Sequence, residues 1–312
     1  MRRPRRLAAL SLALAACRSD GIDVSALEAR HPELRALRPH PLGGTRPYAL
    51  PLDAALTLFL CRWPTPAVLA VSFDGDPDAG QEAALAAALL AWQGAGLGVR
   101  FERVEAREPA AIRVRLRDDW ITSQADTIAD CAVAGAPEPG ETRVPGARLV
   151  AASIHVASAD PHLRETLLHE LGHALGFQGH VPRGRTLMLA REAAVLERAR
   201  EVSETAPLED AALRALYAVP SGAVIARVGL RPEQTAAADR LGALAAARGL
   251  AGPFVRAGDR EGLLWWLEPV GRRLGLRIEG AGDALRRPAA LRLAPATRGA
   301  ERLLASPPGG PG

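Results

Sequence analysis

Apolar and polar residues alternate along several short stretches of the chain. Residues 111–116 and 149–156 alternate cleanly, and this pattern is typical of half-buried strands. Residues 67–73 form an apolar run with β-strand character, whereas residues 99–104 and 127–133 follow the alternation in part. We therefore predict a strand in each of these segments.

Helical segments lie between and after these strands. Residues 79–93 are rich in alanine and carry bulky apolar side chains that can pack on a core, so they predict a helix. Asp160, followed by Pro161, predicts the start of a second helix, and Gly176 predicts its end. Residues 190–202 and 208–217 also predict helices.

The two ends of the chain differ in composition from the middle. Residues 17–50 are rich in Pro, Arg and Gly and predict a flexible tether, with one short helix at residues 25–37. The αβ pattern fills residues 51–222, which we expect to form the main domain. Residues 223–305 predict a small C-terminal domain of unknown role, and the Pro- and Gly-rich residues 306–312 predict a disordered tail.

Within the small C-terminal domain the pattern is weaker. It predicts helices at residues 231–248 and 259–271, and short strands at residues 274–278 and 290–293. The adjacent Trp265 and Trp266 fit either a ligand platform or, as we expect, ordinary packing of aromatic side chains.

Composition and charge narrow the class of protein. The chain has 312 residues and 48% of them are hydrophobic, which supports a real core. The net charge of +4 comes from Arg2, Arg3, Arg5 and Arg6, because removing these four from the 39 basic residues leaves 35 against 35 acidic ones. This balance argues against a nucleic-acid-binding protein.

The first residues have the features of an export signal. Residues 1–16 combine a basic start with an apolar run too short to span a bilayer, which predicts a signal peptide. The run L-A-A-C at residues 14–17 resembles the lipobox of bacterial lipoproteins, and this resemblance implies that Cys17 carries a lipid anchor. The alternative is ordinary secretion, with Cys17 incidental. Arg18, in place of Asp, resembles the sorting signal for the outer rather than the inner membrane.

The candidate chemistry lies in the second predicted helix. His169 and His173 are four residues apart and project from one face of a helix, and Glu170 completes an H-E-x-x-H motif. His180 follows seven residues later. Three imidazoles and one open position are typical of a catalytic Zn²⁺ site, in which Glu170 is the general base and acid for a zinc-activated water.

These residues together resemble the metzincin clan of zinc metallopeptidases, nearest to its matrixin-like bacterial branch. The match extends from His169 through Gly176 and His180 to Met188, which resembles the Met-turn residue below the zinc. The resemblance covers roughly residues 60–222.

The resemblance to metzincins implies both a fold and an activity. The expected fold is α+β: a twisted mixed β-sheet with an N-terminal helix and a zinc-binding active-site helix, then a helical lower subdomain and a small C-terminal α/β extension. The expected protein is a zinc metalloendopeptidase, a hydrolase with one catalytic Zn²⁺. It would act on protein or peptide substrates as a monomer, in the cell envelope, without nucleic acid.

Two departures from the metzincin pattern leave alternatives open. Gly179 occupies the usual position of the third histidine, so His180 comes one residue late and we expect a bulge that Gly179 tolerates. No Tyr follows Met188. The spacing of Glu192 from His173 resembles the gluzincin pattern, in which Glu192 would be the third ligand. An inactive metzincin-fold binding module is a further alternative.

Two cysteines remain after Cys17. Cys61 and Cys131 could form one disulfide in an exported domain, but their spacing alone does not establish that they are close in space.

Overall fold

The structure is a computed structural model, and it describes residues 25, 28–29, 32–37, 40–52, 55–121, 124–138, 140–190, 192–202, 208–229, 256–257, 259–260, 263–270 and 273–279. The predicted signal peptide, Cys17, the helix at residues 231–248, the strand at residues 290–293 and the C-terminal tail lie outside these residues. None of the helices within them combines the length and apolarity needed to cross a membrane.

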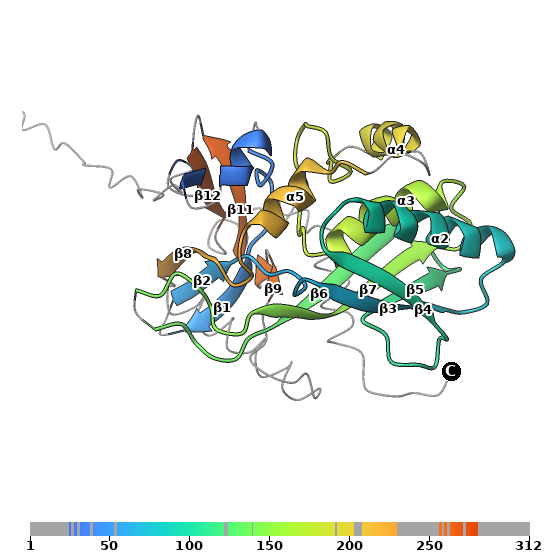
Figure 1. The fold of residues 1–312 in the computed structure, drawn as a ribbon, viewed down its shortest axis with the longest axis horizontal. Coiled ribbons are helices and arrows are strands. Elements are labelled where there is room, and N and C mark those ends of the chain that lie inside the picture. Colours follow the sequence, from blue (N-terminus) through green and yellow to red (C-terminus); the bar gives the residue numbers. More distant parts are fainter. Residues whose placement is uncertain are drawn as a thin grey trace, which may run out of the picture.

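A five-stranded mixed sheet forms the centre of the fold (Figure 1), and all five strands predicted from the alternation are confirmed to within two residues. Neighbouring strands are parallel, except that the edge strand β6 runs antiparallel to β7. In spatial order the strands are β4 (Val99–Val104), β3 (Ala67–Asp74), β5 (Ile112–Arg117), β7 (Arg148–Ala157) and β6 (Ala125–Ala132).

Two helices cover one face of this sheet, as Figure 1 shows: α2 (Ala79–Gly94) and α3 (Leu163–Ala174). Helix α2 matches the prediction and begins at Asp78, which forms a reciprocal capping box with Gln81. Apolar side chains from the sheet and both helices are buried in one continuous core. The sheet and α2 thereby fix the position of α3, the helix that carries the H-E-x-x-H motif.

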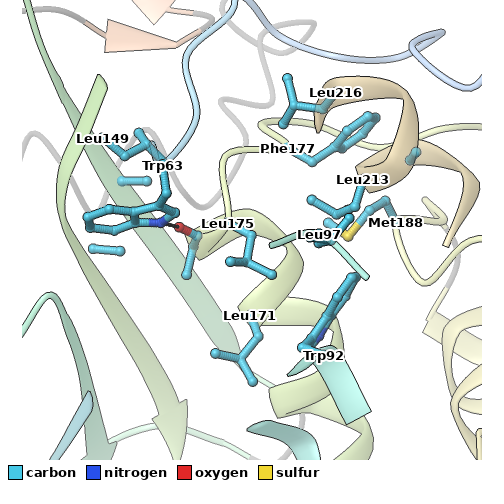
Figure 2. Close-up of a cluster of buried hydrophobic side chains, with 14 of the residues drawn as sticks. Trp63, Trp92, Leu97, Leu149, Leu171, Leu175, Phe177, Met188, Leu213 and Leu216 are labelled. Carbon is cyan, nitrogen blue, oxygen red and sulfur yellow. Dashed lines mark hydrogen bonds between the residues drawn. The ribbon is translucent and has the colours of Figure 1, made fainter. Parts of the chain in front are cut away.

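Aromatic side chains hold α3 at its carbonyl groups. The indole N–H of Trp92 donates to Leu168 O at 2.8 Å, and that of Trp63 donates to Ala174 O at 2.9 Å. In Figure 2, Trp63 and Trp92 lie on opposite sides of the helix. Ala174 O is one of the last carbonyls of the helix, which lack helical partners, so Trp63 stabilises the helix end. The bond from Trp92 lies in the middle of the helix and helps to fix its orientation.

The start of α3 differs from the prediction. His162, not Asp160, is its N-cap residue. Asp160 instead closes a turn before the helix, where its carboxylate accepts from the His162 N–H at 2.8 Å and the Thr166 hydroxyl at 2.6 Å. The short polar side chain at residue 160 therefore still fixes the helix entry, two residues earlier in the chain.

The helices after α3 agree with the prediction. They are α4 (Glu192–Glu201) and α5 (Ala211–Ala218). Asp210 is the N-cap residue of α5, and its side chain accepts from the Leu213 N–H at 2.9 Å.

Two smaller sheets contain described segments that come before and after the main sheet in the chain. One has the order β8 (Val224–Gly229), β2 (Ala55–Phe59), β1 (Tyr48–Leu52) and β9 (Arg256–Ala257), and the other β10 (Asp259–Arg260), β11 (Leu263–Val270) and β12 (Arg273–Glu279). The described part of the predicted helix at residues 25–37 includes a 3-10 helix, η1 (Pro32–Leu37).

The predicted helix at residues 259–271 is wrong, because its described residues form β10 and β11. In β11, Trp265 and Leu267 are buried while Trp266 and Glu268 are partly exposed, which is the two-residue period of a strand. Trp265 packs against Leu56 and Leu58, which agrees with the packing interpretation of this residue. The strand expected at residues 274–278 is confirmed as part of β12.

Strand pairing extends across both predicted boundaries of the main domain. Tyr48 and Leu50, assigned to the tether, are buried, because β1 pairs with β2 and its residues join the core. Beyond residue 222, β8 pairs with β2, so described segments on both sides of the predicted boundary share one sheet. A separate C-terminal domain therefore stays a prediction.

A disulfide joins Cys61 to Cys131, with Cα atoms 6.3 Å apart. It connects the segment after β2 to the edge strand β6, a pairing that the sequence left open.

Candidate metal centre

Three histidines converge beside α3. His169 and His173 lie one turn apart on the helix, and their Nε2 atoms are 3.1 Å apart. The Nε2 atom of His180 lies 3.1 Å from that of His169 and 3.3 Å from that of His173. A tetrahedral ion with Zn–N bonds of ~2.0–2.1 Å requires ligand atoms about 3.3–3.4 Å apart. The predicted trio is therefore compatible with a single zinc ion.

Backbone carbonyls select the metal-binding tautomer of the two helical histidines. His169 Nδ1 lies 2.6 Å from Leu187 O, and His173 Nδ1 lies 2.7 Å from Phe177 O. A carbonyl only accepts hydrogen bonds, so each Nδ1 carries the proton and each Nε2 keeps a free lone pair. Such hydrogen bonds also fix the orientation of the imidazole rings.

The three histidines are also in the protonation state that binds a metal ion. Burial lowers the pKa of His169, and burial together with the neighbouring imidazoles holds the pKa of His173 well below its ordinary value. The His180 side chain is exposed as a whole, but desolvation of its ring within the trio and the neighbouring His169 and Arg46 lower its pKa. The three rings are therefore neutral at pH 7, which is the form that binds a divalent cation.

The loop after α3 brings His180 back to the helix. Gly176 and Gly179 have φ angles of +112° and +104°, a region that favours glycine. A Cβ on Gly176 would lie 2.7 Å from Cys61 O, and one on Gly179 would overlap Gly44 O. Both positions therefore require glycine, and Gly179 can accommodate the extra residue as expected.

Residues 44–46 hold the other side of this loop. The Arg46 N–H donates to Gln178 O, and Thr45 pairs with Gly179 in an antiparallel bridge. The same segment pairs with β11, because the Gly44 N–H donates to Leu267 O at 2.5 Å and the Leu267 N–H donates to Thr45 O at 2.9 Å. The third histidine is thus supported by segments from both ends of the chain, which the sequence analysis did not foresee.

Met188, the predicted Met-turn residue, packs against α3. It is fully buried, and a Cβ on Gly172 would overlap its sulfur. Figure 2 shows Met188 next to Leu213 of α5. The residue at position 172, between His169 and His173 on the helix, must therefore be small where it faces Met188.

Asp210 is a site residue that the sequence analysis missed. Its buried carboxylate accepts from the Thr186 hydroxyl at 2.9 Å and from the Leu187 N–H at 2.7 Å. Leu187 O in turn accepts from His169. The only signal in the sequence was an acidic residue in the first turn of the helix predicted at residues 208–217, which suits the start of a helix but does not indicate Thr186 and Leu187 as partners.

We predict that Asp210→Asn weakens zinc binding by about 10-fold or more, because the amide nitrogen of Asn would face a donor where the carboxylate has an acceptor. A competition titration with a chromophoric chelator measures this. Asp119→Asn, at an exposed ion pair with Arg117, is the matched control. Equal zinc affinities of the two variants would contradict the prediction.

Glu170 lies next to His169 and is 6% exposed. Burial raises its pKa to about 7, and a hydrogen bond from Thr127 opposes that rise. The Thr127 hydroxyl lies 2.5 Å from Glu170 Oε2. A divalent cation bound beside the carboxylate would favour its charged form, which is the form needed in a general base.

The rival ligand Glu192 is the first residue of α4, and its side chain lies outside the described part of the structure. Among the described residues, His169, His173 and His180 form the group of potential ligand atoms that lie within 4.8 Å of one another.

No protein-family model matches the chain, and no curated protein matches it in sequence. Among solved structures it is similar to high choriolytic enzyme 1, a hatching-enzyme zinc protease from the medaka fish Oryzias latipes. That match has 18% identity and a TM-score of 0.25, over 38% of this chain and 50% of that one. Myroilysin matches at 21% identity and a TM-score of 0.24, over 37% and 50%.

The chain thus spans about half the length of each of these two structures.

Proposed function

We propose that this protein is a zinc-dependent endopeptidase of the metzincin type. One observation carries the proposal: three neutral imidazoles present Nε2 atoms 3.1–3.3 Å apart, and the helix that supplies two of them also carries the buried Glu170. A zinc site built from three histidines keeps an open position, which is typical of catalytic rather than structural zinc.

The chain's own residues supply the rest of the chemistry. His169, His173 and His180 would hold the ion, which lowers the pKa of water to about 7 and polarises a carbonyl group. Glu170 would take a proton from the attacking water and pass it to the leaving amine. Together these roles hydrolyse an amide bond without a covalent intermediate on the protein.

The edge strand β6 offers a place for the substrate. Among the described strands it pairs with β7 alone, so no other described strand pairs with its outer edge, where the Tyr48 hydroxyl takes one carbonyl, that of Ala129. An extended peptide can pair with such an edge as an additional strand. Because Thr127 of β6 contacts Glu170, a peptide on this edge would lie close to the general base.

Two alternatives share these residues. A gluzincin-type site would use Glu192 in place of His180. A binding module would keep the metal and the peptide-binding edge without cleaving the peptide.

We also propose that the protein acts outside the cytoplasm, anchored to the membrane through Cys17. The disulfide between Cys61 and Cys131 supports export, because such bonds persist in oxidising compartments.

The direct test uses the purified full chain. We expect one zinc ion per chain by elemental analysis, and cleavage of internal bonds in casein or a peptide library by mass spectrometry. Chelation should remove both the zinc and the cleavage, and added zinc should restore them. A fully zinc-loaded protein that cleaves none of these substrates would contradict the peptidase proposal and favour the binding module.

A further inference from the structure

Thr127 is a polar residue in an apolar layer. It lies on β6 opposite Ile154 of β7, and both side chains are buried, with Thr127 only 2% exposed. A buried hydroxyl without a hydrogen-bond partner is destabilising, so a threonine at this position needs a partner inside the protein. Valine has the same shape and would fill this position without that requirement.

The hydroxyl is directed at Glu170. Thr127 Oγ1 lies 2.5 Å from Glu170 Oε2 and 3.4 Å from Glu170 O. The hydroxyl has one proton to donate, and a separation of 2.5–2.7 Å is typical of a charge-assisted O–H···O⁻ bond. The proton therefore goes to Oε2.

The two carboxylate oxygens of Glu170 are consequently not equivalent. No donor among the described residues reaches Oε1, whereas Oε2 is held by Thr127. A single hydrogen bond to one oxygen restricts rotation of the carboxylate and leaves the other oxygen available.

We propose that Thr127 is the positioning residue of the general base: it holds Glu170 Oε2, so that Oε1 accepts the proton from the attacking water. This inference rests on the proposed function, because it assigns a role to Thr127 only if Glu170 is the base.

The location of Thr127 strengthens the assignment. Its strand is the edge on which an extended peptide would pair, so one residue contributes to the position of both the substrate and the base. The strand is fixed nearby, because the Tyr48 hydroxyl donates to Ala129 O at 3.1 Å and Cys131 is in the disulfide. Thr127 therefore presents its hydroxyl from a rigid support, as precise catalysis requires.

Two substitutions of Thr127 distinguish the effect of its hydroxyl group from the effect of its packing. Thr127→Val keeps the shape and removes the hydroxyl, whereas Thr127→Ser keeps the hydroxyl and removes a methyl group. In the zinc-loaded full chain, we expect Thr127→Val to lower kcat about 10- to 100-fold, with KM changed less than about 2-fold. Thr127→Ser should retain kcat within about 3-fold, and all three proteins should bind one zinc per chain.

A second readout does not depend on catalysis. In zinc-free protein with ¹³C-labelled glutamate, the carboxyl resonance that is absent from Glu170→Gln belongs to Glu170. In Thr127→Val this resonance should titrate at a higher pH than in the wild type, because a donor to Oε2 favours the charged carboxylate. Thr127→Ser should titrate like the wild type.

The outcomes are distinct. Equal kcat and equal Glu170 titration in Thr127→Val and the wild type would overturn the proposal, and so would equal losses in Thr127→Val and Thr127→Ser. If the wild type cleaves no peptide but Thr127→Val still shifts the Glu170 resonance, the contact is upheld and the peptidase proposal fails instead.

Discussion

Replacing Glu170 with glutamine is expected to lower peptide hydrolysis by about 10²- to 10⁴-fold while zinc stays bound. Glutamine has nearly the same shape as glutamate, but its amide does not accept a proton from water at neutral pH. The proposed zinc ligands are the three histidines, and the Nδ1 hydrogen bonds of His169 and His173 go to backbone carbonyls and not to Glu170. The measurement is kcat on a cleaved peptide, with zinc content determined on the same samples.

Glu165→Gln is the matched control for this prediction. Glu165 lies in the first turn of the same helix, where its nearest ion-pair partner is Arg164 at 3.9 Å. It should therefore keep full activity. If Glu170→Gln hydrolyses peptides as fast as Glu165→Gln, Glu170 is not the general base.

Replacing His180 with alanine is expected to weaken zinc binding by more than about 100-fold, because loss of an outer-shell partner alone costs 10- to 100-fold. His169 and His173 would remain with two Nε2 ligands from one helix. Glu192→Ala should bind zinc like the wild type. Chelator competition measures both affinities at one pH, since protons compete with the metal for imidazole.

The opposite result would favour the gluzincin alternative. If Glu192→Ala loses zinc while His180→Ala retains it, the third ligand is the glutamate and the contact between the histidines is incidental. His162→Ala is a useful control, because this half-buried N-cap residue of α3 lies outside the histidine trio.

The sequence predicted those parts of the molecule whose pattern is local. A two-residue alternation located the strands of the main sheet, and the four-residue spacing of His169 and His173 placed both on one helix face. The turn to His180 was predictable from Gly176 and Gly179, because glycine adopts backbone conformations that other residues rarely reach. Both residues do have positive φ angles in the structure.

Contacts between distant segments could not be predicted in this way. Residues 263–267 are an unbroken apolar run, which fits a strand or a buried helix equally well, so the prediction of a helix there was wrong. Nothing in the neighbourhood of Thr127 or Asp210 indicates that their partners are Glu170 and Leu187. Such hydrogen bonds depend on the tertiary fold and not on local propensity.

The pairing of residues 44–46 with both the His180 loop and β11 has a consequence for the order of assembly. The chain is synthesised from its N-terminus, and Leu267 follows His180 by many residues. The hydrogen bonds between Leu267 and residues 44–46 therefore form only after β11 has left the ribosome. Until β11 has been synthesised, the loop that carries His180 lacks this outer support, so the three histidines reach their final arrangement only once both segments are present.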